Sequence, residues 1–108
     1  MIEKVHTLSQ DKEKNIEKVI VNEHLHYMHV ILPKGEGLPL HQSNANVYML
    51  VLKGTLTLAL NHKEPHRYTP LTLLEIPFDT TMSVRNVDME PLEITIVKAP
   101  APGTFYKK

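Results

Sequence analysis

The sequence contains no cysteine and no tryptophan, and only four glycines and two phenylalanines among its 108 residues. Without cysteine the chain has no disulfide, no thiolate metal ligand and no cysteine nucleophile. It also has no net charge, because twelve Lys and Arg residues balance twelve Asp and Glu residues. A basic surplus would favour nucleic acid or an anionic membrane surface, so the composition predicts neither partner.

Long hydrophobic runs are absent as well. No apolar stretch approaches the roughly 20 residues that a membrane-spanning helix needs. The first ten residues, MIEKVHTLSQ, lack the basic-then-apolar order of a secretory signal. We therefore expect a cytoplasmic protein without membrane contact. Its length suits one domain with a single core.

The chain lacks a convincing long amphipathic helix, and short runs of β-strand character take its place. Val47–Leu52 is almost wholly apolar, and Thr55–Leu60 alternates with a period of two. Comparable runs recur at 16–21, 24–32, 38–43, 66–68, 71–76, 82–86 and 92–97. Many short strands with proline and glycine between them are typical of an all-β sandwich or barrel. We expect a barrel over residues 16–98, an N-terminal arm over 1–15 and a C-terminal tail over 99–108.

The apolar run 47–52 also bears on quaternary structure. Successive side chains of a strand point to opposite faces. The two sets are Val47, Met49 and Val51 on one face and Tyr48, Leu50 and Leu52 on the other. One set can fill a barrel, whereas the other needs cover from outside. We therefore predict a homodimer that buries the outer set.

The segment from residue 35 to residue 86 resembles the two sequence motifs of the cupin family. The residues that hold motif positions at the family's spacing are Gly35, His41, Gly54, Pro77 and Asn86. Two structural glycines of the second motif are replaced by Leu71 and Asp79. The resemblance covers about residues 16–98. It implies a small single-domain cupin, a double-stranded β-helix or jelly-roll barrel.

The resemblance also implies where a cupin holds its divalent metal, namely on two histidines and a glutamate of the first motif and a histidine of the second. Of these four positions only His41 is retained, and the others are Ser43, Val47 and Met82. Iron, manganese, nickel or zinc needs three or four nitrogen or carboxylate donors at about 2.0–2.3 Å. This donor set is too small, so we expect degenerate metal motifs and no metal or other cofactor.

Without a metal cage, the barrel interior is still the expected cavity. We predict that it binds a small organic ligand, in a pocket lined by His41, Ser43, Val47, Met49, Met82, Val84 and Asn86. In this interpretation His41 contacts the ligand or transfers a proton. The plain alternative is a histidine hydrogen-bonded to nearby backbone.

A second hypothesis is a metal-dependent cupin enzyme, of dioxygenase or isomerase type, with replacement ligands. His24 and His26 are two residues apart on an expected strand, so they share a face, while His29 points to the opposite face. Together with His41 and Met82 they would form the rebuilt site. Solvent exposure is the alternative for this pair. A third hypothesis is a structural or sensor module, and the sequence leaves enzyme activity undecided.

Overall fold

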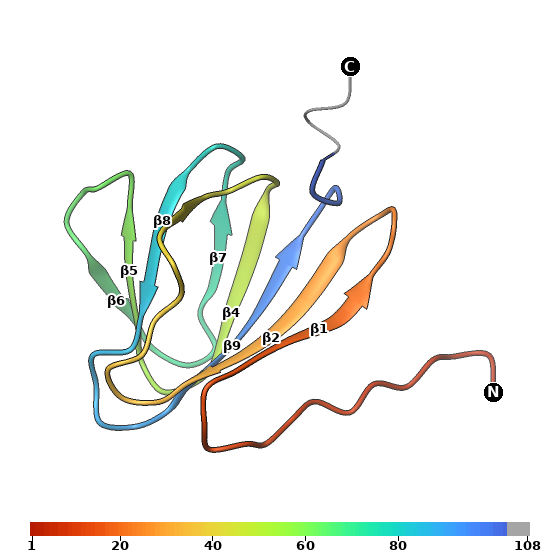
Figure 1. The fold of residues 1–108 in the computed structure, drawn as a ribbon, viewed down its shortest axis with the longest axis horizontal. Coiled ribbons are helices and arrows are strands. Elements are labelled where there is room, and N and C mark those ends of the chain that lie inside the picture. The colour runs from red at the N-terminus through yellow and green to blue at the C-terminus, as the bar shows by residue number, and fades with distance from the viewer. Residues whose placement is uncertain (104–108) are drawn as a thin grey trace.

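The computed structural model describes residues 1–103 and shows two antiparallel sheets that face each other as a barrel (Figure 1). The five-stranded sheet has the order β1 (Asn15–Val21), β2 (His26–Leu32), β9 (Leu92–Lys98), β4 (Val47–Lys53) and β7 (Leu73–Ile76). The four-stranded sheet has the order β3 (His41–Gln42), β8 (Thr81–Arg85), β5 (Leu56–Leu60) and β6 (His66–Tyr68). Residues 1–103 contain no helix. The all-β prediction is confirmed.

Several expected strands are shorter in the structure, among them 24–32 and 38–43. Strand β2 begins at His26 rather than at residue 24, because the Asn22 side chain accepts hydrogen bonds from the amides of His24 and Leu25 and closes a turn there. The expected strand 38–43 is regular only at His41–Gln42. Before that point, a single bridge between Gly37 and Arg85 holds the chain against β8.

The hydrophobic core lies between the two sheets. Along β4, Val47, Met49 and Val51 are buried, whereas Tyr48, Leu50 and Leu52 are half-buried on the outer face. This confirms the predicted division of the strand into two faces. The inward side chains of β4 meet those of the other strands in one cluster: Val30, Leu32, Leu56, Leu58, Ile76, Met82, Val84, Leu92, Ile94 and Ile96.

Three turn residues show why the motif glycines matter. Gly54 has φ +78°, and a Cβ there would lie 2.4 Å from the carbonyl oxygen of Pro91, so only glycine fits. Leu71 and Asp79 replace motif glycines, yet they keep the left-handed conformation at φ 67° and 70°. The backbone has therefore stayed where the glycines would place it. An L-residue in that region costs roughly 1–2 kcal/mol.

The chain outside the strands consists of an arm and a short described part of the tail. Residues 1–14 form no strand, and most of them are exposed (Figure 1). After β9, the Ala99 amide donates to the Asn46 carbonyl at 3.1 Å, and Ala101 is buried. The rest of the predicted tail, 104–108, lies outside the described residues. Within 1–103, nothing has the length and apolar character of a membrane-crossing helix.

Candidate functional site

His41 lies at the start of β3, directly opposite Met82 of β8, so both side chains start from the inner face of the four-stranded sheet. The imidazole is half-buried, and its Nδ1 lies 2.9 Å from the Pro39 carbonyl oxygen. Because a carbonyl only accepts, Nδ1 donates in this contact. The structure thus gives His41 the backbone hydrogen bond of the plain alternative.

Ser43 is buried and fully engaged in local structure. Its Oγ donates to the Pro77 carbonyl at 3.0 Å and accepts the Thr80 amide at 2.9 Å. These two bonds tie the chain after β3 to the β7–β8 turn. The hydroxyl therefore has a structural role at the position where the cupin motif has its second histidine.

Val47 and Met82 complete the motif's metal positions, and the four residues together do not fit a divalent metal. Both are 1% exposed and belong to the hydrophobic core. The set offers one imidazole nitrogen, a committed hydroxyl and a soft thioether, whereas these metals require several nitrogen or oxygen donors. Within residues 1–103 no group of three or more His, Cys, Asp or Glu side chains is arranged to hold a metal ion.

Among residues 1–103, the structure does not bring His24, His26 and His41 together as one group of possible metal ligands. His24 lies in the turn before β2, 3.4 Å from Glu23, and His26 begins β2 in the five-stranded sheet. His41 lies on the other sheet. His26 is also paired directly with Lys98, whose pKa is lowered by burial and by nearby Lys18. A positively charged neighbour opposes binding of a metal cation.

The remaining predicted pocket residues are interior ones. Met49 and Val84 pack in the core, and Asn86 is completely buried. The Asn86 amide group donates to the carbonyls of Leu32 and Glu90, and its oxygen accepts the Asp88 amide, so it shapes the turn after β8. The structure thus places most of the predicted pocket in packed interior. Val47 also lines a groove of about 340 Å³ at the β4–β7 edge.

A second groove lies beside these residues, lined by the β5–β6 hairpin and the β7–β8 turn. Both segments lie at the same end of the barrel (Figure 1). We call it the mouth groove. It measures about 340 Å³, and the residues that line it include Leu58, Leu60, Lys63, His66, Tyr68, Pro77 and Thr80.

The sheet register explains how the mouth groove relates to the predicted pocket. Leu58 pairs with Val84 and Leu60 with Met82, so the two leucines stand next to the predicted residues on the same inner face. His66 pairs with Leu58 on the other side, which brings the imidazole to that face as well. The interior is filled at β8, and the open space begins one strand further on.

His66 and Tyr68 are the site residues that sequence reasoning missed. The sequence predicts a strand at 66–68 and assigns it no function. Their spacing of two residues was the available signal, because it places an imidazole and a phenol on one face. Which face that is depends on pairing with β5, and the sequence does not show the pairing.

The chain is similar to the uncharacterized protein MJ0764 of Methanocaldococcus jannaschii, with 41% identity over 103 residues, 94% of this chain and 89% of that protein. The crystal structure of MJ0764, an RmlC-like cupin family protein with a double-stranded β-helix fold, matches with a TM-score of 0.94 and 39% identity over 99% of each chain. An RmlC-like cupin protein from Desulfovibrio desulfuricans matches with a TM-score of 0.77 and 21% identity, over 92% of this chain and 98% of that one. The match to the Desulfovibrio desulfuricans protein shows the fold alone. No family model matches the chain.

Proposed function

This chain belongs to the RmlC-like cupin family, and we propose that it binds a small organic molecule in the mouth groove. The observation that carries the proposal is the combination of apolar and polar groups on one face. Leu58 and Leu60 form an apolar floor, and His66 and Tyr68 border it. Ligand sites in proteins are concave, mainly apolar, and contain a few placed polar groups that orient the ligand.

The lining also favours a class of ligand. A groove of about 340 Å³ accommodates a compact molecule rather than a polymer. Its apolar part would lie on the leucines. Lys63, His66 and Tyr68 offer hydrogen-bond donors to a polar or anionic group, while Glu64 at the same groove disfavours a second negative charge. We therefore propose a small aromatic or aliphatic acid with one carboxylate.

A screen of small aromatic and aliphatic carboxylates by ligand-observed NMR tests this proposal. We expect at least one class to bind and Leu60→Lys to abolish the binding, because the substitution puts a long charged chain on the apolar floor. Met89→Lys is the matched control, since Met89 is 76% exposed and lies away from the groove. Failure of every compound to bind, or equal binding by Leu60→Lys, would contradict the proposal.

We propose that this binding needs no metal at the cupin motif positions. The support is the donor set described above, with one imidazole among four residues. Elemental analysis of untagged protein should give metal far below one equivalent per chain, and added Fe, Mn, Ni or Zn should not be retained. Stoichiometric metal that is lost in His41→Ala would overturn this view and favour a metal-dependent enzyme. No catalytic residue is proposed, and the cytoplasmic location remains a prediction from the sequence.

We also propose a homodimer through the outer face of the five-stranded sheet. Leu50 on β4 is half-buried and pairs with Leu73 on β7, which is 62% exposed. Tyr48 and Leu52 extend the apolar surface along β4. A second copy is the proposed occupant because a two-fold axis lets one apolar row cover its equivalent. Sedimentation should show a dimer that Leu73→Arg dissociates and Met89→Arg leaves intact. A monomeric parent protein would contradict the proposal.

A further inference from the structure

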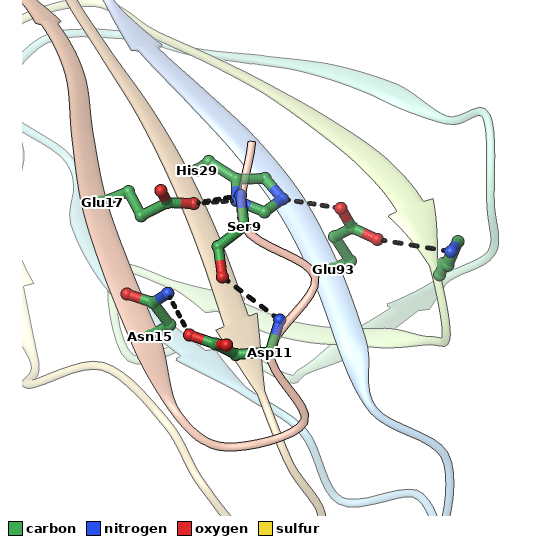
Figure 2. A network of polar contacts seen from close by, with 7 residues as sticks. Ser9, Asp11, Asn15, Glu17, His29 and Glu93 are labelled. Carbon is green, nitrogen blue, oxygen red and sulfur yellow. Dashed lines mark hydrogen bonds and ion pairs between the residues drawn. The ribbon is translucent and has the colours of Figure 1, made fainter. Parts of the chain in front are cut away.

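The most completely buried polar side chain on the outer face of the five-stranded sheet is His29 on β2. It is 0% exposed, and it lies between two carboxylates (Figure 2). Its Nδ1 is 2.7 Å from Glu17 Oε1 on β1, and its Nε2 is 2.6 Å from Glu93 Oε2 on β9. We call these three residues the Glu–His–Glu trio. It takes no part in the mouth groove or in the motif positions.

The trio also holds the N-terminal arm. The Ser9 amide donates to Glu17 Oε1 at 2.9 Å, so this oxygen accepts both from the arm and from the imidazole. The Ser9 hydroxyl accepts the Asp11 amide at 3.1 Å, and the Asn15 side chain donates to the Asp11 carboxylate at 3.0 Å (Figure 2). These contacts link the otherwise irregular arm to the sheet, and Glu17 is the sheet residue that bonds to both the arm and His29.

A count of hydrogens indicates the charge state of the trio. A neutral imidazole has one N–H donor and one lone pair, whereas both ring nitrogens of His29 face carboxylate oxygens. Two hydrogen bonds therefore require an imidazolium or a protonated carboxyl. Hydrogen bonds from His29 and from the Ser9 amide hold the pKa of Glu17 below its ordinary value, against the opposing effect of burial. The second oxygen of Glu93 lies 3.9 Å from the Lys53 ammonium, so this carboxyl has a positive group on each side when the ring is charged. The imidazolium is the state that satisfies all three residues.

We propose that the Glu–His–Glu trio is a protonation-dependent latch that fastens the N-terminal arm across the outer face of the sheet. When the trio loses its shared proton, one ring nitrogen presents a lone pair to a carboxylate, and that contact becomes repulsive. If the affected carboxylate is Glu17, the acceptor for the Ser9 amide moves with it. A groove of about 790 Å³ lies between the arm and the sheet, bordered by Ile31 and Leu52. Release of the arm exposes this part of the outer face.

The charged groups in and around the latch come from every element packed at this place. Glu17 lies on β1, Glu93 on β9 and Lys53 on β4. The arm adds His6, Asp11 and Lys12 along the same groove. Among them, only the trio joins a fully buried ring to the arm's backbone. Surface charges of the arm are screened by water and salt, so their titration moves the arm less.

Two NMR measurements on the full chain test the latch. The ¹⁵N signals of the His29 imidazole at neutral pH should show both nitrogens protonated. Alkaline pH should remove the second proton. Hydrogen-exchange protection of the arm amides from Leu8 to Asp11, corrected for the intrinsic rate, should then fall about 10- to 100-fold, because a charge-assisted hydrogen bond contributes a free energy of that size. Core amides such as that of Ile94 should keep their protection. A ring that carries a single proton at every pH at which the protein is folded would overturn the proposal.

Ser9→Pro tests whether the trio controls the arm or only stabilises the sheet. Proline removes the amide hydrogen that Glu17 accepts and leaves the buried ring untouched. The imidazole should then titrate as before, while the arm loses its pH-dependent step in protection. Thr7→Pro is the control, and it should keep that step. If the step persists in Ser9→Pro, the arm does not follow the trio and the inference is wrong.

Discussion

His41 and His29 are the same type of side chain in two different environments, one on the inner face of the four-stranded sheet and one on the outer face of the five-stranded sheet. His41, on the inner face at a metal position of the cupin motif, is half-buried and bonds to one backbone carbonyl. His29, outside both motifs and on the outer face, is fully buried between two carboxylates. The motif residues Ser43 and Asn86 bond to the backbone, whereas a network of ionisable side chains lies on the outer face.

The largest effect is expected inside the barrel, from Met82→Ala. Met82 is 1% exposed and packs in the core, so its truncation leaves a cavity and should lower the free energy of unfolding by about 3 kcal/mol. Met89→Ala is the matched control, because Met89 is 76% exposed, and it should change stability by less than about 0.5 kcal/mol. Urea unfolding measures both. Equal, small effects would mean that Met82 borders open space and that the interior is not filled.

The contrast between the histidines gives the next prediction. His29→Ala removes the donor of two carboxylates, and it should lower stability by about 2 kcal/mol, since part of the loss is regained when water reaches the glutamates. His41→Ala removes one partly exposed contact and should cost less than about 1 kcal/mol. Urea unfolding of both variants under the same conditions compares the two. A larger loss in His41→Ala would reverse the ranking of the two sites.

The sequence predicted the barrel because alternation and turn residues are local signals. The division of β4 into inner and outer side chains needed only a period of two. Local signals do not predict the mouth groove, because its position depends on which strand pairs with β6. The role of His29 was hidden for a similar reason: Glu17 and Glu93 are 12 and 64 positions away in the chain. Each of these contacts is set by sheet register, which a single sequence does not display.

A substitution in a turn should have a smaller effect on stability, and in the opposite direction. Leu71 sits at a motif glycine position with φ 67° and is 84% exposed, so its side chain loses little packing when removed. Leu71→Gly should raise the free energy of unfolding by up to about 1 kcal/mol, because relief of the left-handed strain exceeds the added entropy of the unfolded chain. Thermal unfolding can detect this gain. A destabilised Leu71→Gly would mean that the leucine packs usefully, for instance against another copy of the chain.

The smallest expected effect is the loss of the Glu17 charge at low pH, which should also open the latch. Because the pKa of Glu17 is lower in the folded state, its charge stabilises the fold above the ordinary glutamate pKa of about 4.3, and this contribution is lost as the pH falls through the lower folded value. As the pH falls from about 6 to about 3, the free energy of unfolding of the parent protein should decrease more steeply than that of Glu17→Gln. Urea unfolding at a series of pH values measures both. Glu90→Gln, a change at an exposed position, should follow the parent. Identical slopes for Glu17→Gln and the parent would show that the carboxylate gains nothing from His29. Acid thus removes the acceptor of the latch and alkali removes its donor, so arm protection should be greatest between the two.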